Sequence, residues 1–422
     1  MRFKSYSSKL SAWAIPALYA CLAFVAGLTV PRLETHFFPD LVSPMSVSAA
    51  IAIYSSIGSG MLALTGIVFS LTFVMVQFSA TAYSPRLVLF LARDSVMSHA
   101  LGIFTATFLY AVSALAGIDR FASGSVPFIS VLVIIGLLLA SVAMFIALIG
   151  RIGSLQVNQM LIFTGDHARK VIAKLYPPLQ SATAIPEREK FGPSHLTQTL
   201  VHQGRPSSVQ SVNVVGLVNL ARGSDAVIEM AVSVGDSVAE SMQLLRVFNA
   251  QRPIDDSMLK QEIQLGAERT FEQDPKYALR LLVDIAIRAL SPAINDPTTA
   301  VQALDQIEDL LLRLGHRQLE IGDYHDADGK LRLVISFPSW EDLLRLSFDE
   351  ISFCGATSVQ VMRRMNALIA NLRTMLPEVR RPALVYWDTR LSTLIARSFP
   401  SDQERIEASA EDRQGLGVPR PQ

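Results

Sequence analysis

The sequence has few of the features on which enzymes and metalloproteins depend. Its only two cysteines, Cys21 and Cys354, lie far apart, which argues against a disulfide framework or a Cys-based metal site. The Gly-rich phosphate loop followed by Lys-Ser or Lys-Thr, the His-Glu-x-x-His helix and the Gly-x-Ser-x-Gly elbow are all missing, and the seven histidines are scattered. We therefore expect no enzymatic activity, no metal site and no cofactor.

An excess of charge is missing as well. The 37 basic and 37 acidic residues give a formal net charge of zero, whereas nucleic-acid-binding proteins usually carry a basic excess or patch. Hydrophobic residues make up 50% of the chain and the mean hydropathy is +0.35, which is typical of a membrane protein. We expect the lipid bilayer, and no nucleic acid, as a partner.

One long stretch, residues 41–85, contains no Asp, Glu, Lys, Arg or His. A bilayer core of about 30 Å needs only about 20 helical residues, so this stretch is long enough to hold a spanning helix with several turns left over. We place that helix within residues 49–77. At about 100° per residue, one face of it is small and polar, and it consists of Ser55, Ser59, Gly66, Ser70, Gln77 and Thr81.

Two interpretations of this polar face remain open. Small residues let helices approach closely and hydroxyls can bond across helices or to the preceding turn, so the face can be a packing surface. Alternatively, it lines a water-filled path through an oligomer, where hydroxyls and the Gln77 amide replace part of the hydration of an ion. Gln77 is the best discriminator, since a primary amide that faces lipid is costly.

Three further apolar segments, residues 12–30, 98–118 and 126–150, are each about long enough to span a bilayer. Basic residues near the ends of the four spans are biased to one side, with Arg2, Lys4, Lys9, Arg86, Arg93 and Arg151 against Arg32 and Arg120. The positive-inside rule then predicts a multi-pass protein of the bacterial inner (plasma) membrane with both termini cytoplasmic. Arg86 and Arg93 are expected at headgroup level, as anchors or in a vestibule.

The rest of the chain is expected to be a cytosolic α/β (α+β) region, so the predicted fold class is a membrane α-helical protein with four transmembrane helices followed by that region. We expect a transmembrane domain over residues 1–155 and an inward helix with a linker over residues 156–206. Short β-branched runs at residues 212–215, 226–232 and 243–247 predict a small β-rich domain over residues 207–250. A mixed α/β helical domain over residues 251–399 and a disordered tail over residues 400–422 complete the prediction.

Two Asp-Pro pairs mark helix starts in the helical region. Asp274-Pro275 and Asp296-Pro297 each place an Asp at the N-cap and a Pro at the first helical position. Around Asn295 and Asp296 the chain reads as a helix-break-helix, and the free amides of the new helix could hold an anion. Asp296 would usually occupy that place itself as the cap, and we favour this role. A hairpin is predicted over residues 318–337, with strands at residues 319–321 and 331–335 and an Asp-rich turn between them. In the register of an EF-hand loop Tyr324 is first and Ile335 twelfth, so calcium ligands are missing at both ends.

The segments Phe69–Thr72, Phe78–Arg86 and Glu268–Ala300, together with the order of the elements, resemble a family of predicted bacterial membrane proteins, the domain of unknown function 2254. The resemblance spans most of residues 10–380 and implies an integral membrane protein. It implies no known activity, cofactor or catalytic residue.

Our leading hypothesis is an oligomeric ion channel or pore whose second helix lines the path. Four spans leave little room for a path within one protomer, so copies of the chain are the expected partners. The alternative is a membrane-anchored scaffold or sensor whose cytosolic region binds a partner, ions or a small ligand. Replacing polar residues of the second helix separates the two hypotheses, because only a pore should lose conduction while it still assembles.

Overall fold

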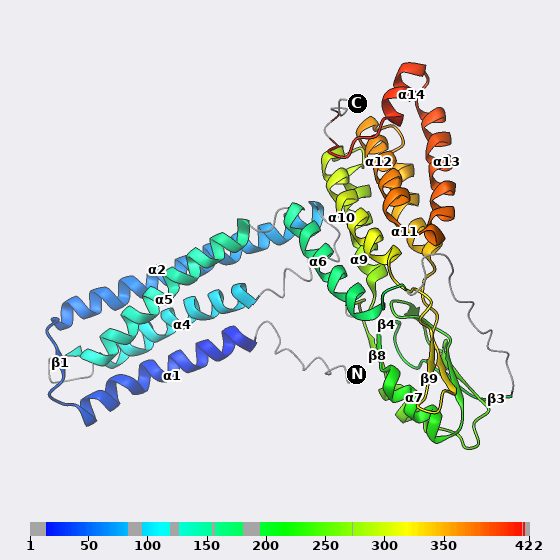
Figure 1. Cartoon of the computed structure of the whole chain (residues 1–422). Coiled ribbons are helices and arrows are strands. Elements are labelled where there is room, and N and C mark those ends of the chain that lie inside the picture. The colour runs from blue at the N-terminus through cyan, green and yellow to red at the C-terminus, as the bar shows by residue number, and fades with distance from the viewer. Residues whose placement is uncertain are drawn as a thin grey trace. The chain divides into compact units, whose positions relative to one another are not determined.

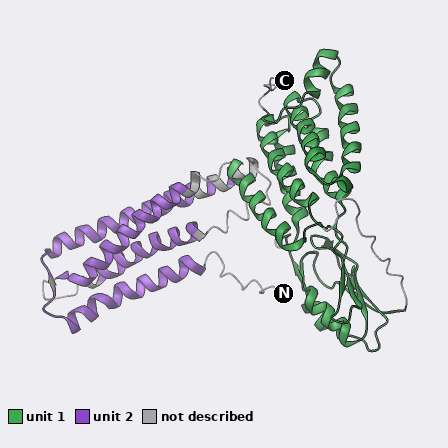
Figure 2. Cartoon of the chain, in the orientation of Figure 1, with its two compact units in different colours: residues 1–4, 157–422 green, residues 5–156 purple. Residues whose placement is uncertain are grey.

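The computed structural model describes residues 14–82, 95–118, 126–153, 157–179, 195–271, 273–415 and 417. The chain forms two compact units (Figures 1 and 2), one of residues 5–156 and one of residues 1–4 and 157–422. We call them the membrane unit and the C-terminal unit. Each is described separately.

The membrane unit consists of long apolar helices: α1 (Ala14–Phe37), α2 (Val47–Ala82), α4 (Ser95–Ile118) and α5 (Phe128–Gly153). All four are long and apolar enough to cross a membrane. The 36 residues of α2 extend over about 54 Å, more than the roughly 30 Å of a hydrocarbon core. Two short antiparallel strands, β1 (Val42–Ser43) and β2 (Val126–Pro127), join the loop after α1 to the start of α5.

Helix α4 lies at the centre of this unit and contacts each of the other three helices. Half of its spanning window is buried, against 17–22% for the others. Close packing explains Gly27 in α1, because a Cβ there would lie 1.9 Å from the hydroxyl of Ser113 in α4. Thr107 of α4 and Ser141 of α5 share a hydrogen bond of 2.9 Å between their hydroxyls. Small and hydroxylated residues thus join the helices, as is usual in membranes.

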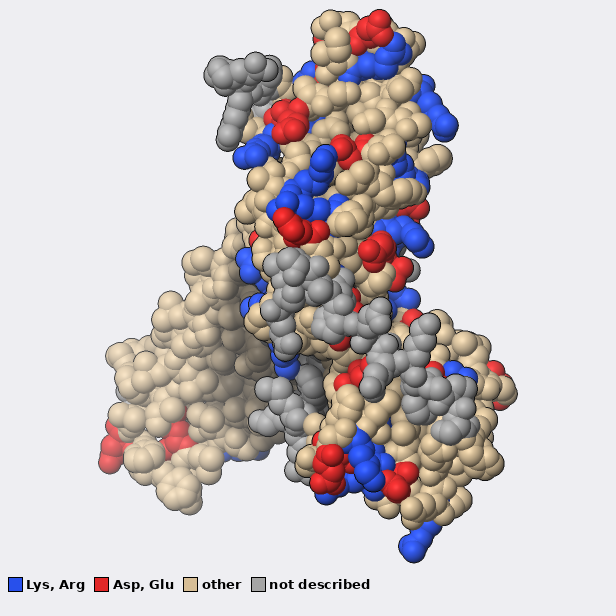
Figure 3. All heavy atoms as spheres, turned by 45° about the vertical axis from the view of Figure 1, so that its right-hand side comes forward, with Lys and Arg blue, Asp and Glu red and all other residues tan. Residues whose placement is uncertain are grey.

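Charged side chains are unevenly distributed between the units. Among the described side chains of the membrane unit, the Lys, Arg, Asp and Glu residues are Arg32 and Glu34, in the last two turns of α1, and Asp40, just after α1. The membrane-helix surface in view in Figure 3 is mostly uncharged, whereas the C-terminal unit carries charges of both signs. This contrast fits a unit in lipid and a unit in water.

The C-terminal unit contains two sheets. Five strands form a mixed sheet in the order β3 (Leu196–Val201), β7 (Gln243–Phe248), β5 (Val227–Met230), β10 (Leu331–Val334) and β9 (Asp323–His325). Only β5 and β10 pair in parallel, and all other neighbours are antiparallel. The second sheet is antiparallel, in the order β6 (Ser237–Val238), β4 (Ser207–Val212) and β8 (Ile263–Gly266).

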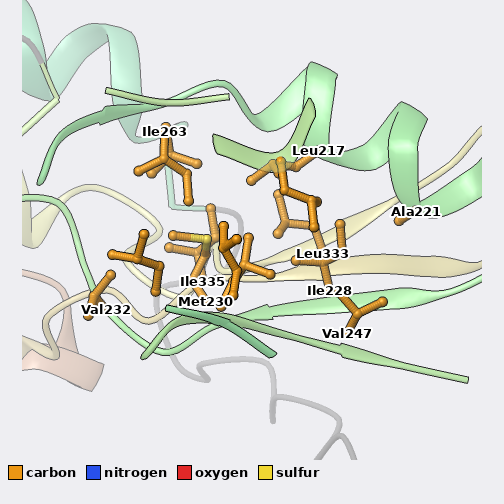
Figure 4. Close-up of a cluster of buried hydrophobic side chains, with 14 of the residues drawn as sticks. Leu217, Ala221, Ile228, Met230, Val232, Val247, Ile263, Leu333 and Ile335 are labelled. Carbon is orange, nitrogen blue, oxygen red and sulfur yellow. The ribbon is translucent and has the colours of Figure 1, made fainter. Parts of the chain in front are cut away.

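The core of this β part lies between the strands and helix α7 (Val214–Gly223), as Figure 4 shows. Alternate residues of β5, Ile228 and Met230, point into it, as expected for a strand with one face on the core. Leu217 and Ala221 of α7 lie one turn apart and cover the same core.

A bundle of helices forms the rest of the C-terminal unit (Figure 1). Helix α6 packs against α9 and α10, and α12 packs against α10, α13 and α14. The short helix α8 (Asp256–Gln261) precedes β8. The bounds of the bundle helices are α6 (Val157–Leu175), α9 (Pro275–Ala289), α10 (Pro297–Gly315), α11 (Trp340–Cys354), α12 (Val359–Met375), α13 (Arg381–Ser398) and α14 (Asp402–Ser409).

Four sequence-based expectations for this unit are wrong. Residues 214–215 are helical because Asn213 caps α7 by accepting a hydrogen bond from the Gly216 N–H. Residues 207–250 are no separate β-rich domain, since β3 comes from the expected linker and β9 and β10 come from the expected helical domain. The first strand of the predicted hairpin begins at Asp323, after the expected residues 319–321.

The fourth correction concerns the tail, expected to be disordered over residues 400–422. Residues 402–409 form α14, which begins with a reciprocal capping box between Ser401 and Glu404. Beyond it, the Asp412 carboxylate accepts hydrogen bonds from three backbone N–H groups. Local capping and packing on α12 therefore order this charged segment.

Candidate functional site

The polar face of α2 points away from the rest of the membrane unit. Tyr54, Met61 and Val68 are buried and lie on the side of α2 that packs on the other helices. The residues that were predicted to line a path are centred roughly 150° from them around the helix, at about 100° per residue. All of these with a described side chain are exposed within the single chain: Ser55, Ser59, Gly66, Ser70 and Gln77.

Within the described part of the protomer, Ser55, Ser59, Gly66 and Ser70 are therefore exposed rather than buried against the other helices. The Ser59 hydroxyl donates to the Ser55 carbonyl at 2.8 Å, so its proton is satisfied within the helix. The side chain of Thr81 lies outside the described residues, as do Arg86 and Arg93, and the predicted vestibule or interface role of the two arginines stays a prediction.

Glu34 forms a polar cluster in the membrane unit that was missed in the sequence analysis. It is 3% exposed, and its two carboxylate oxygens accept hydrogen bonds from the N–H groups of Ile129 (2.7 Å) and Ser130 (3.1 Å) in the first turn of α5. The Ser130 hydroxyl in turn bonds the phenols of Tyr54 (3.1 Å) and Tyr110 (3.0 Å). The carboxylate thus caps α5 from α1 and links all four helices.

Glu34 was missed because the first span was expected to end at residue 30, whereas α1 continues to Phe37. A signal was available in the spacing. Ala23, Gly27, Pro31 and Glu34 follow one another at helical intervals and are the buried residues of α1.

Asp274 and Asp296 both occupy N-cap positions. Oδ1 of Asp274 accepts from the Tyr277 N–H at 3.3 Å, and Oδ1 of Asp296 accepts from the Thr299 N–H at 3.1 Å. Oδ2 of Asp296 also accepts from the Thr299 hydroxyl at 2.6 Å, so the carboxylate fills the place that an anion would take. Asn295 precedes it with a φ of +48°, a left-handed conformation that Asn tolerates better than most residues.

Asp274 differs from Asp296 because it also lines a cavity of about 80 Å³ in the C-terminal unit. A cavity needs only about 10–15 Å³ to hold one water, so this one has room for several waters or a small organic group. Most of its wall is apolar. It lies among the end of α6, the start of α9, the turn after β5 and the segment after β10, and is lined by Leu175, Tyr176, Val212, Val214, Ser233, Val234, Gln273, Asp274, Pro275, Lys276, Tyr324, Ile335, Ser336, Phe337 and Pro338.

Two residues that line this cavity each carry a buried oxygen that has no hydrogen-bond partner among the described residues. Asp274 and Tyr176 are each 1% exposed, and neither Oδ2 of Asp274 nor the Tyr176 hydroxyl has a partner among the described residues. Burial raises the pKa of Asp274, opposed by the positive charges of Lys276 and Arg269 and by backbone N–H groups. Burial also raises the pKa of Tyr176, and the negative charge of Asp274 adds to that effect.

Gly235 approaches the same carboxylate. It has a φ of +92°, and a Cβ built on it would lie 2.1 Å from Oδ2 of Asp274. A glycine is therefore required there both for the backbone conformation and for the space. The other Asp-rich feature, the turn at Asp326, is structural, because its carboxylate accepts from the N–H groups of Asp328 and Lys330 and pairs with Arg332 at 2.6 Å.

Within the described ranges, no three His, Cys, Asp or Glu side chains are grouped so that they could hold a metal ion. Cys21 and Cys354 are free and exposed.

A family model described as a predicted membrane protein (DUF2254) matches residues 9–371. The chain belongs to the DUF2254 family. It is 25% identical over 407 residues to proteins of Mycobacterium bovis and Mycobacterium tuberculosis, each described as uncharacterized, with 93% of this chain and 78% of each relative covered. No solved structure matches it.

The segment that matches the DUF2254 family contains the main structural features of this chain. The matched residues include the four apolar helices and the whole wall of the cavity, and they end before α13 and α14. The chain is thus a membrane protein with a C-terminal α/β region. Asp274 and Asp296 lie in one of the segments that carry the resemblance in sequence, and in the structure only Asp274 lines the cavity.

Proposed function

We propose that copies of this protein assemble in the bacterial inner membrane around α2 to form an ion-conducting pore. The observation that carries the proposal is the outward orientation of the small polar face of α2, opposite to the side that packs on the other helices. Hydroxyl groups and backbone are exposed on the surface of the protomer at Ser55, Ser59, Gly66 and Ser70. Water and neighbouring copies are better surroundings for these groups than lipid is.

The orientation that supports this function has both termini in the cytoplasm. Six of the eight basic residues near the spans favour that side. The C-terminal unit then forms the cytoplasmic part of each protomer. The expectation that the protein is no enzyme and binds no nucleic acid stays a prediction.

The test is purification in a mild detergent, mass determination by light scattering, and planar-bilayer recording of the same fraction. The expected result is an oligomer with discrete conductance, which Gln77→Leu and the double replacement Ser59→Leu/Ser70→Leu reduce or abolish while the mass is retained. Leu62→Ile and Ile67→Leu, at exposed apolar positions of the same helix, are the matched controls and should leave conductance unchanged. A monomer at native mass, or conductance indifferent to all polar replacements, would contradict the pore.

A second candidate, a membrane-anchored sensor, is favoured by the cavity at Asp274. In a sensor the four helices serve as an anchor and the C-terminal unit binds a ligand or partner. Silent bilayers together with saturable ligand binding would favour the sensor over the pore.

A further inference from the structure

At the cavity beside Asp274, residues with buried, unpartnered polar atoms line an open space. Buried polar atoms in folded proteins nearly always find hydrogen-bond partners, so two unpaired oxygens beside one cavity call for an explanation. Oδ1 of Asp274 caps α9, whereas Oδ2 has no hydrogen-bond partner among the described residues. The Tyr176 hydroxyl can both donate and accept.

The N-cap role alone does not explain why the carboxylate is buried here. Asp296 performs the same role on α10 with both of its oxygens engaged. Asp274 has a spare oxygen, and the turn with Gly235 leaves room for that oxygen only because residue 235 has no side chain. The molecule thus retains a buried acid where a fully satisfied cap would be simpler.

We propose that this cavity binds a small organic cation, whose ammonium group donates a hydrogen bond to Asp274 and whose hydrocarbon part lies against the apolar wall. A charged donor is the strongest partner for a buried carboxylate. Aromatic side chains on the wall, Tyr176, Tyr324 and Phe337, favour a cation further, because the face of an aromatic ring attracts positive charge.

The volume and the other charge at the cavity limit the ligand. About 80 Å³ suits a compact molecule with a short hydrocarbon chain. Lys276 also lines the cavity and is half-buried, so it repels a cation that does not touch the carboxylate directly. Direct contact with Asp274 is therefore the decisive interaction. The proposal concerns the C-terminal unit alone and does not depend on the pore.

Three probes with the same four-carbon chain test the proposal: n-butylammonium, n-butanol and butanoate. The full-length protein is kept in a neutral maltoside detergent, and binding is measured by titration calorimetry and by the shift of the thermal unfolding midpoint. We expect saturable binding of n-butylammonium, with at least tenfold weaker binding of n-butanol and none of butanoate.

Matched variants then assign the binding to this carboxylate. Asp274→Asn keeps an N-cap side chain but removes the charge, and it should weaken n-butylammonium binding at least tenfold. Asp296→Asn makes the same change at the equivalent cap of α10, away from the cavity, and should leave binding unchanged. Tyr176→Phe keeps the ring and should weaken binding severalfold, which provides a second reading if Asp274→Asn disturbs the fold.

The outcomes that overturn the proposal are distinct from one another. If no probe binds, the cavity holds water only. If butanoate binds and Lys276→Met abolishes it, the site takes anions. If n-butylammonium binds equally well to the wild type and to both Asp274→Asn and Tyr176→Phe, it binds elsewhere. None of these outcomes affects the test of the pore, which is read as conductance and mass.

Discussion

Replacing Gly235 with Ala tests whether the carboxylate of Asp274 and the turn beside it fit together as described. The new Cβ would lie 2.1 Å from Oδ2 of Asp274, well below any real contact, and the residue would keep a φ of +92° that an L side chain rarely adopts. The Asp274 side chain must then move, and the hydrogen bond that caps α9 is lost. The substitution adds one methyl group and should destabilise the C-terminal unit for two separate reasons.

The magnitude follows from these two effects. A backbone conformation of this kind costs about 1–3 kcal/mol for a residue with a Cβ, and loss of an Asp N-cap costs about 0.5–2 kcal/mol. Together they give roughly 1.5–5 kcal/mol. In a unit of this size about 1 kcal/mol shifts the unfolding midpoint by about 2–4 °C, so we expect the midpoint to fall by roughly 3–20 °C.

Tryptophan fluorescence offers a specific assay, because Trp340 and Trp387 are both buried in the C-terminal unit. The third tryptophan is Trp13, so the full chain with Trp13→Phe reports unfolding of this unit alone. Gly329→Ala is the matched control. Gly329 has a φ of +76° but nothing within 4 Å of an added Cβ, so only the conformational cost applies there.

A double replacement separates the two costs. Asp274→Ser keeps a good N-cap residue and shortens the side chain, so Gly235→Ala in that background should cost no more than Gly329→Ala. The reasoning is refuted if Gly235→Ala and Gly329→Ala cost the same in the wild-type background, or if Asp274→Ser does not lessen the cost of Gly235→Ala.

Two further predictions concern buried carboxylates. Burial raises the pKa of Asp274 above the ordinary value of 3.8, so the folded state holds the proton more tightly than the unfolded state does. Stability from this group is fully present below pH 3.8 and is lost as the pH rises through the pKa of the folded state. The urea midpoint of Asp274→Asn should therefore rise relative to that of the wild type between pH 4.5 and pH 7.5. A difference that stays constant over this range would contradict the raised pKa. Glu34 accepts two hydrogen bonds from N–H groups of α5, each worth about 1.5–3 kcal/mol. We therefore expect Glu34→Gln to speed hydrogen exchange of the Ile129 and Ser130 amides by about tenfold or more. Asp40→Asn, at an exposed position beyond α1, should leave this exchange unchanged.

Features that depend on a few neighbouring residues could be predicted from the sequence. Both Asp-Pro pairs start helices at Pro275 and Pro297, because the cap and the fixed φ of Pro act within one turn. The capping box between Ser339 and Asp342 also acts within one turn, and it starts α11. The four apolar helices are likewise evident from length and composition, although α1 and α2 extend beyond the expected ends.

Features that depend on distant pairing could not be predicted. No local pattern shows that β5 pairs with β10, so the β part looked like a domain of its own. At residues 212–215 the β-branched composition favours a strand, but the Asn213 cap starts a helix there. The cavity joins Tyr176, Val234, Asp274 and Phe337, which come from four separate segments, so the sequence marked Asp274 as a cap but not as a cavity residue.

The order of strands in the five-stranded sheet has a consequence for synthesis of the protein on the ribosome. β5 ends at Met230, and its parallel neighbour β10 begins at Leu331, about 100 residues later. At about 5–20 residues per second, β5 waits roughly 5–20 s for that partner after it is made. During this time one edge of β5 and the apolar residues around Ile228 are uncovered while the membrane helices, made earlier, are already entering the bilayer. Nascent chains that stop before Leu331 should therefore be targets for chaperones and proteases, and chains that extend past Val334 should escape them.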